Sequence, residues 1–257
     1  AWAVEQGYGR PEDLAHTEER GRLNGADPGV VSDRAKSRGE DQLGTLGSGN
    51  HFLELGVIDR IVDEDAAAAF GFREEQVTLM IHSGSRGLGY QVCDDFLQVM
   101  MRAAARYGID LPDRQLCCAP VKSQPGRDYL AAMAAAANYA WANRQIMMCL
   151  ARESLQNTLG ASAASLDMRL VYDVCHNIAK FEMHDVDGER RRLCVHRKGA
   201  TRAFPGDREE VPAAYRLVGQ PVLVPGDMGT GSWICAGTSK AMRETFGSAC
   251  HGAGRVM

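Results

Sequence analysis

Asp128-Tyr-Leu-Ala-Ala-Met-Ala-Ala-Ala-Ala-Asn-Tyr-Ala-Trp-Ala-Asn143 begins the stretch of sequence that decides the fold. The stretch runs on to Leu159 without a glycine or a proline, and alanine is the strongest helix former, so we predict one long helix over residues 128–159. Its methionines and Trp141 are expected to pack in the core. Two further helices are predicted, around residues 11–22 and over residues 91–107. Apolar side chains recur on one face of the latter: Val92, Phe96, Val99 and Ala103.

Strands are predicted on both sides of this long helix. Runs of β-branched and aliphatic residues indicate strands over residues 52–58, 77–81, 170–175, 222–224 and 234–236. A hairpin is expected where Asp187-Gly188, a strong turn signal, separates residues 182–186 from residues 192–196. Because no repeat and no clear linker divides the chain, the sequence predicts an α+β fold. We expect mixed sheets with flanking helices in a single domain over residues 1–257.

Composition narrows the classes of protein to consider. A net charge of −4 over 257 residues argues against a globally basic nucleic-acid clamp, although a local basic strip can still bind RNA. Such a strip is present, and it is either an RNA-binding surface or an ordinary solvated face: Arg190, Arg191, Arg192, His196, Arg197, Lys198 and Arg202. The eight cysteines form no CxxC pair, so we expect reduced thiols in a cytoplasmic protein. The longest apolar run, residues 130–142, is too short to cross a membrane.

His251 lies in the most informative motif of the chain, Ala249-Cys-His-Gly-Ala-Gly-Arg255. The small neighbours of this histidine allow a ligand to approach it closely, and Arg255 offers a fork of donors to a phosphate. An imidazole in this setting is able to attack phosphorus. The alternative is a histidine that serves only the local structure of a glycine-rich loop, and the motif by itself leaves both readings open.

Three other histidines share a setting of small and polar neighbours: His51, His82 and His176. The last two are expected where apolar strands end. Neutral imidazole is the commonest metal ligand, and catalytic metal sites draw their ligands from separate loops. Each of the three alone is more simply explained as structural, but together they favour a metal site. His16 and His184 lack such neighbours, and we expect both at the surface.

Two glycine-rich segments suit phosphate binding. Residues 83–89 supply backbone N–H donors and the guanidinium of Arg86 just ahead of a predicted helix. Residues 225–232 form a second glycine-rich turn. The sequence holds no Walker A motif, no Gly-x-Gly-x-x-Gly and no Lys-x-Asp-Gly, so neither a P-loop, a dinucleotide fold nor a ligase with a lysine nucleophile is indicated.

Taken together, these motifs resemble the RtcB family of RNA-splicing ligases. The matching segments follow the order of the family over nearly the whole chain: residues 41–54, 81–89, 174–180, 195–204, 225–232 and 250–255. The resemblance implies an RtcB-like catalytic domain. It also implies joining of RNA 3′-phosphate or 2′,3′-cyclic phosphate ends to 5′-hydroxyl ends in tRNA splicing or RNA repair, with GTP and two Mn²⁺ ions. Whether an archease-like helper protein takes part is left open.

The resemblance also implies roles for single residues. His251 matches the histidine that attacks the α-phosphate of GTP and becomes guanylylated. His51, His82 and His176 match metal ligands. The residues that match the guanylate pocket are Asn50, His51, Phe52, Leu53, Glu54, His176, Asn177, Pro225, Gly226, Asp227, Met228, Ser232, His251, Gly252, Ala253 and Gly254. RNA-phosphate contacts are expected from Arg86, Arg197, Lys198, Arg202 and Arg255.

The chain departs from the family pattern in three respects. The family has an Asp-x-Gly-Cys-Gly segment that supplies an aspartate and a bridging cysteine to the metal site, and a lysine that contacts guanine. Neither is in this sequence, so we expect an internal fragment that lacks both termini. Asp227 stands where the family more often has a small hydroxylated residue. Two rival functions stay open: a metal-dependent phosphohydrolase or nuclease that needs no nucleophilic His251, and a non-catalytic RNA- or nucleotide-binding fragment.

Overall fold

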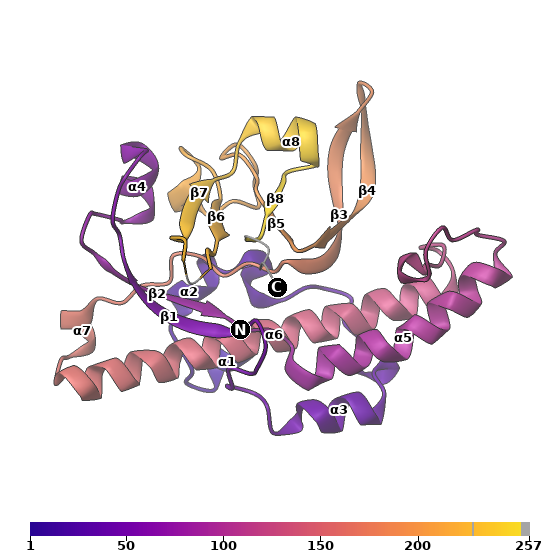
Figure 1. The fold of residues 1–257 in the computed structure, drawn as a ribbon, viewed down its shortest axis with the longest axis horizontal. Coiled ribbons are helices and arrows are strands. Elements are labelled where there is room, and N and C mark those ends of the chain that lie inside the picture. The colour runs from indigo at the N-terminus through magenta and orange to yellow at the C-terminus, as the bar shows by residue number, and fades with distance from the viewer. Residues whose placement is uncertain (228, 253–257) are drawn as a thin grey trace. The chain divides into compact units, whose positions relative to one another are not determined.

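The structure, a computed structural model, describes residues 1–227 and 229–252. It consists of helices and two-stranded sheets, which confirms the predicted α+β class (Figure 1). The chain divides into two compact units. The first unit comprises residues 1–11, 21–54 and 80–168, and the second comprises residues 12–20, 55–79 and the described residues from 169 onward.

The first unit is mostly helical. Its elements are α1 (Trp2–Glu5), α3 (Asp33–Glu40), α5 (Arg86–Arg106), α6 (Gln124–Leu159), α7 (Ala163–Leu166) and 3₁₀ turns at Pro28–Val30 and Arg114–Leu116. The predicted long helix is confirmed as α6. It begins four residues earlier than predicted because the side chain of Ser123 accepts a hydrogen bond from the Gly126 N–H, and a proline is tolerated in the first turn.

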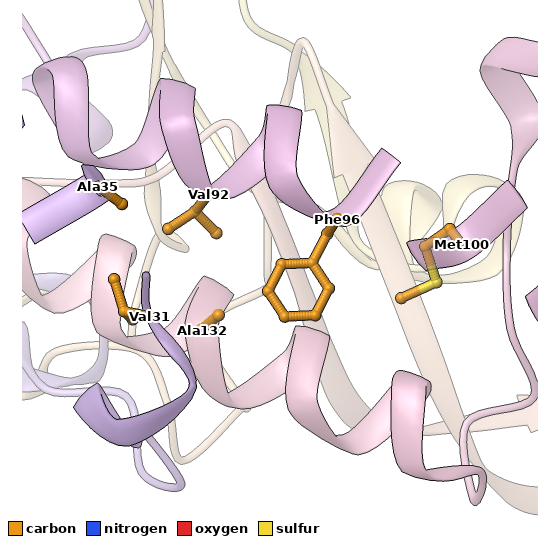
Figure 2. Packing of buried hydrophobic residues seen from close by; sticks show 6 residues of the cluster. All are labelled: Val31, Ala35, Val92, Phe96, Met100 and Ala132. Carbon is orange, nitrogen blue, oxygen red and sulfur yellow. The ribbon is translucent and has the colours of Figure 1, made fainter. Parts of the chain in front are cut away.

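A cluster of apolar side chains joins α5, α6 and the segment that leads into α3. Figure 2 shows Phe96 of α5 reaching toward α6 beside Ala132, with Val92 and Met100 on the same side of α5. Val31, which precedes α3, and Ala35 of α3 complete the cluster, and both are buried. The apolar face predicted for this helix is therefore confirmed, and burial of such a face is the main source of helix stability in a folded protein.

The start of α5 differs from the sequence-based expectation. The sequence predicts a helix from residue 91 that follows the glycine-rich segment 83–89, yet the helix begins at Arg86, within that segment. A Cβ atom at Gly87 would lie 2.8 Å from the carbonyl oxygen of Arg38, and a Cβ at Gly89 would overlap the side chain of Ser85. Gly87 therefore allows a close approach to the backbone of Arg38, Gly89 leaves room for the Ser85 side chain, and neither glycine marks a loop.

The second unit carries most of the strands. Its elements are α4 (Glu64–Phe70), β3 (Asn177–Val186), β4 (Glu189–Lys198), β5 (Ala200–Arg202), β6 (Pro221–Val224), β7 (Trp233–Ala236), α8 (Ser239–Thr245), β8 (Ser248–Cys250) and 3₁₀ turns at Glu18–Gly21 and Ala213–Tyr215. The pairs β3–β4, β5–β8 and β6–β7 are antiparallel. Besides the turn Glu18–Gly21, whose last residue belongs to the first unit, three described elements contain residues of both units: α2 (Pro11–Ala15), β1 (Phe52–Val57) and β2 (Val77–His82). β1 pairs with β2.

The β3–β4 hairpin confirms the turn predicted at residues 187–188. Asp187 and Gly188 have φ angles of 52° and 81°, and Val186 pairs with Glu189. Two consecutive residues with positive φ match the twist of the flanking strands, which is why Asp-Gly is such a strong signal. The strands predicted over residues 52–58, 77–81, 222–224 and 234–236 are also confirmed, with ends shifted by one residue at most.

Two predicted elements are wrong. Residues 170–175 form a single bridge, Thr17 to Asp173, in place of a strand. The helix predicted around residues 11–22 breaks into α2 and a 3₁₀ turn, in which Glu19 and Arg20 have positive φ. The cause is tertiary. Glu18 turns inward, where its carboxylate accepts a hydrogen bond from the Cys175 N–H, and local helix propensity is too weak to resist that contact.

The core of the second unit is built around an almost fully enclosed aromatic residue, Phe204. It packs in a cluster with Ala66, Phe70, Tyr172, Val211 and Tyr215. All eight cysteines carry free thiols, as predicted. Within the described residues, no helix combines the length and apolar character that spanning a membrane requires.

Candidate functional site

The main chain at His251 is held by two hydrogen-bonded contacts. β8 ends at Cys250, which pairs with Ala200 of β5, and the His251 N–H donates to the carbonyl oxygen of Gly199 (3.1 Å). The Gly199 N–H in turn donates to the carbonyl oxygen of His176 (2.8 Å) and to Oδ1 of Asn177 (3.3 Å). Gly199 therefore connects the segment of His251 with the segment of His176.

These contacts stack the two imidazoles on each other. The ring centroids of His176 and His251 are 3.7 Å apart and the rings are nearly parallel, at 6°. Burial lowers the pKa of His251, so its imidazole is neutral near pH 7 and carries a lone pair. His176 was expected at the end of a strand, but it directly precedes β3. The rings of His176 and His251 are therefore in direct contact.

Pro225, the first residue of the glycine-rich segment 225–232, lies against the residue that follows His251. A Cβ atom at Gly252 would lie 3.0 Å from the carbonyl oxygen of Pro225, so the two segments approach closely. Within the turn, the Gly226 N–H donates to Oγ of Ser232 (3.1 Å). Asp227 is exposed, and a hydrogen bond from the Gly229 N–H lowers the pKa of its carboxyl group. Asp227 therefore acts as a turn cap within its own loop.

A second pair of histidines lies in the first unit. The ring centroids of His51 and His82 are 5.8 Å apart, and the ring of Phe52 lies 5.3 Å from that of His82. Nη1 of Arg86 donates to Nδ1 of His51 (3.2 Å), and its Nε donates to Oγ1 of Thr45 (3.1 Å). Burial and the charge of Arg86 lower the pKa of His51, which keeps the imidazole neutral, as a metal ligand must be.

Backbone geometry around this pair is restricted. Arg86 has a φ of 54°, an uncommon value for a residue other than glycine, and this directs its side chain to Thr45 and His51. Gly47 has a φ of 104°, and a Cβ atom there would overlap both Arg86 and His51. Glycine is therefore required at position 47 for Arg86 and His51 to lie as they do.

Asn143 organises both loops of this pair, a role that no sequence motif predicts. It is a fully buried residue of α6. Its Oδ1 accepts from the N–H groups of Gly44 (2.6 Å) and Thr45 (3.1 Å), and its Nδ2 donates to the carbonyl oxygens of Thr45 (3.1 Å) and Gly84 (3.2 Å) and to Oγ of Ser83 (3.2 Å). Only the polarity of one asparagine among alanines could have suggested it.

The remaining residues predicted for the guanylate pocket are spread over loops and strand ends. Asn50, Leu53, Glu54 and Asn177 are exposed to solvent. Leu53 and Glu54 belong to β1, and Asn177 is the first residue of β3. Four residues predicted for the site lie outside the described residues: Met228, Ala253, Gly254 and Arg255.

The structure contradicts two of the predicted RNA contacts. Arg197 is 2% exposed and forms a two-point ion pair with Glu182, at 2.6 and 2.8 Å. Arg202 is 1% exposed and donates to Glu19 (3.2 Å), among other groups. A buried, paired guanidinium is not available to a phosphate, so both arginines stabilise the fold. Lys198 is exposed and keeps its predicted role as a proposal.

The expectation that His16 and His184 lie at the surface is also corrected. His184 is 3% exposed, and its Nε2 lies 3.0 Å from Oε2 of Glu182. His16 is half-buried and contacts the hydroxyl of Tyr215 (2.8 Å). The pleat of β3 places His184 on the same face as Ile178, which turns it toward the core.

Comparisons with known proteins agree with the motifs. A family model described as tRNA-splicing ligase RtcB matches residues 1–257. Proteins named tRNA-splicing ligase RtcB are 64% identical in Archaeoglobus fulgidus, over 256 residues, and 55% identical in Thermococcus kodakarensis, also over 256 residues. Both alignments cover 100% of this chain and 53% of the relative, so the chain spans about half the length of these relatives. A relative of the same name from Pyrococcus furiosus is 58% identical over 257 residues and is covered to 26%. The chain therefore belongs to the RtcB family.

Proposed function

We propose that this chain forms part of the catalytic region of an RNA ligase. The enzyme joins RNA 3′-phosphate or 2′,3′-cyclic phosphate ends to 5′-hydroxyl ends, in tRNA splicing or RNA repair, with GTP and Mn²⁺. The observation that supports this most is the contact between His176 and His251 beside the turn at residues 225–232, in a chain that belongs to the RtcB family. A cytoplasmic location is part of the proposal, and the eight free thiols support it.

His251 is the proposed nucleophile. Its neutral imidazole attacks the α-phosphorus of GTP, so that an N–P bond forms and pyrophosphate leaves. A 2′,3′-cyclic end is first opened by water to a 3′-phosphate. An oxygen of the RNA 3′-phosphate then attacks the same phosphorus and releases the histidine. The 5′-hydroxyl of the second RNA finally attacks the activated RNA phosphate, and GMP leaves. The backbone contacts of His251 with Gly199, and the ring of His176, hold the imidazole in one orientation for these steps.

His51, His82 and His176 are the proposed metal ligands from this chain. The donor set fits, because half-buried imidazoles beside loops suit divalent transition metals. Two bound Mn²⁺ ions would neutralise phosphate charge at the reacting phosphorus. The guanylate pocket is proposed at residues 50–54, 176–177, 225–228, 232 and 251–254, and the close approach of Gly252 to Pro225 supports it.

The His82→Ala variant of the complete protein is expected to bind Mn²⁺ more weakly while the fold survives. Loss of an outer-shell partner typically lowers metal affinity by roughly 10-fold, and loss of a direct ligand should lower the Mn²⁺ affinity by more than that. Isothermal titration with Mn²⁺, read together with thermal unfolding, measures both effects. His196→Ala is the matched control, because this exposed histidine of β4 is not a proposed ligand. Parental Mn²⁺ affinity in a folded His82→Ala protein would rule out the assignment.

An RNA-joining assay tests the proposed reaction against its rivals. The complete protein is given one RNA with a 3′-phosphate and another with a 5′-hydroxyl, together with GTP and Mn²⁺. We expect a joined RNA that depends on GTP and disappears in His251→Ala. Release of phosphate or of shortened RNA without joining would identify a phosphohydrolase or nuclease instead. RNA binding with no reaction and no affinity for Mn²⁺ would favour a non-catalytic module.

A further inference from the structure

The pleat of the β3–β4 hairpin divides the basic strip of the sequence into two faces. Successive side chains of a strand point to opposite sides, so Arg191 and Arg197 lie on one face and their neighbours on the other. We call this other side the outer face. Its β3 members are Asn177, Ala179, Phe181, Met183 and Asp185, and their β4 partners are Lys198, His196, Cys194, Arg192 and Arg190.

The two faces differ in burial. On β3, the inner-face residues Ile178, Lys180, Glu182 and His184 are all buried. On the outer face Ala179 is also buried, but Phe181 is 42% exposed. The four basic side chains of the outer face are exposed: Arg190, Arg192, His196 and Lys198. In Figure 1 the tip of the hairpin extends beyond β5 and β8 of the same unit. The outer face therefore presents an aromatic ring and a row of cations to solvent.

Phe181 and Arg192 already form a stack. The guanidinium carbon of Arg192 lies 4.5 Å from the centroid of the Phe181 ring. A flat guanidinium layered on an aromatic ring is a platform for an unpaired nucleobase, and its N–H groups also reach phosphate oxygens. Three cations, Arg190, Arg192 and Lys198, share the face with one carboxylate, Asp185, so its net charge complements a nucleic-acid backbone.

We propose that the outer face binds a single-stranded segment of the RNA substrate. The Phe181–Arg192 stack takes a base, and Arg190 and Lys198 contact phosphates on either side of it. The face is continuous with the candidate site, because Lys198 pairs with Asn177, the residue after His176. That the bound strand is the enzyme's substrate depends on the proposed function. That the outer face binds RNA is inferred from the geometry and charge of the hairpin alone.

Fluorescence anisotropy with a labelled single-stranded RNA tests this proposal in the complete protein. Arg192→Ala is expected to weaken binding by about 5-fold or more, since it removes a stacking partner. It should also lower the slope of log affinity against log salt by about 0.7, the value for one phosphate contact on a single strand. Arg191→Ala is the matched control, since Arg191 is the neighbouring arginine, lies on the opposite face and pairs with Glu189 (2.8 Å). It should leave the affinity nearly unchanged.

Phe181 supplies a second comparison that keeps the charge constant. Phe181→Leu should weaken RNA binding, and Phe181→Trp, which retains a flat ring, should preserve it. Equal effects of Arg191→Ala and Arg192→Ala, or parental affinity in Phe181→Leu, would overturn the proposal. Transfer of label from GTP to His251 should stay at the parental level in all these variants. If that labelling is absent from the parent while Arg191→Ala and Arg192→Ala still differ, the ligase function fails and the RNA surface stands.

Discussion

Asn143→Ala is expected to lower the free energy of unfolding of the first unit by about 3–5 kcal/mol. Asn143 is fully buried, and its amide satisfies the backbone of two loops. The substitution leaves the N–H groups of Gly44 and Thr45 without their acceptor. Each buried donor that loses its partner lowers the unfolding free energy by about 1–3 kcal/mol. The smaller side chain of alanine also leaves a cavity where the amide group was.

Denaturant unfolding and amide hydrogen exchange measure this effect. The Gly44 and Thr45 amides should lose protection in Asn143→Ala. Asn157→Ala makes the same chemical change at an exposed position of the same helix, and it should leave both measurements nearly unchanged. If Asn143→Ala keeps parental stability and both amides stay protected, the proposed organising role of Asn143 is wrong.

Glu18→Gln is expected to cost about 3 kcal/mol of stability at neutral pH. Burial opposes ionisation of Glu18, but the charges of Lys180 and Arg202 outweigh it and lower the pKa of Glu18 from 4.5 to about 2. The contacts are direct, with Oε1 of Glu18 lying 2.6 Å from Nζ of Lys180. Without the carboxylate charge, the buried positive charges of Lys180 and Arg202 lose one of the negative charges that neutralise them.

The pH dependence has a defined sign. Because the folded pKa of Glu18 is below the unfolded value, the unfolded chain binds the proton more tightly, and stability rises with pH between the two values. The contribution of Glu18 is therefore complete above pH 4.5 and is lost as the pH falls toward about 2. The difference in unfolding free energy between the parent and Glu18→Gln should be constant near neutral pH and should shrink in this acidic range.

Asp33→Asn is the control for this experiment. The side chain of Asp33 is 100% exposed in its ion pair with Lys36, and exposed pairs contribute about 0–1 kcal/mol. A Glu18→Gln protein that is as stable as Asp33→Asn at neutral pH would contradict the account of the buried network. So would a difference from the parent that does not change between pH 4.5 and 2.

The elements that sequence predicts well are those with strong local signals. An alanine-rich stretch without glycine or proline over residues 128–159, ended by Gly160 in a left-handed conformation, defines α6. Asp187-Gly188 defines the β3–β4 turn, because this dipeptide readily adopts positive φ at both positions. Because the signals for α6 and for the β3–β4 turn are local, neighbouring residues in the sequence are enough to predict both elements.

The elements that sequence misses are decided by distant contacts. Glu18 ends a predicted helix because Lys180 and the Cys175 N–H bind its carboxylate. Arg197 belongs to a basic strip in sequence, yet the pleat and Glu182 bury it. The same limit applies to the candidate site. Motifs and resemblance predicted the histidines, but Asn143 carries no motif, and its role depends on two loops that fold onto α6.

Covalent labelling of His251 tests the central claim most directly. The complete protein is incubated with GTP labelled at the α-phosphate and with Mn²⁺, and the labelled peptide is then mapped. We expect an acid-labile label, as is typical of a phosphorus–nitrogen bond, on His251 itself. The label should be absent in His251→Ala and retained in His196→Ala. Label on another residue, label that persists in His251→Ala, or no label in a protein that still joins RNA would contradict the account.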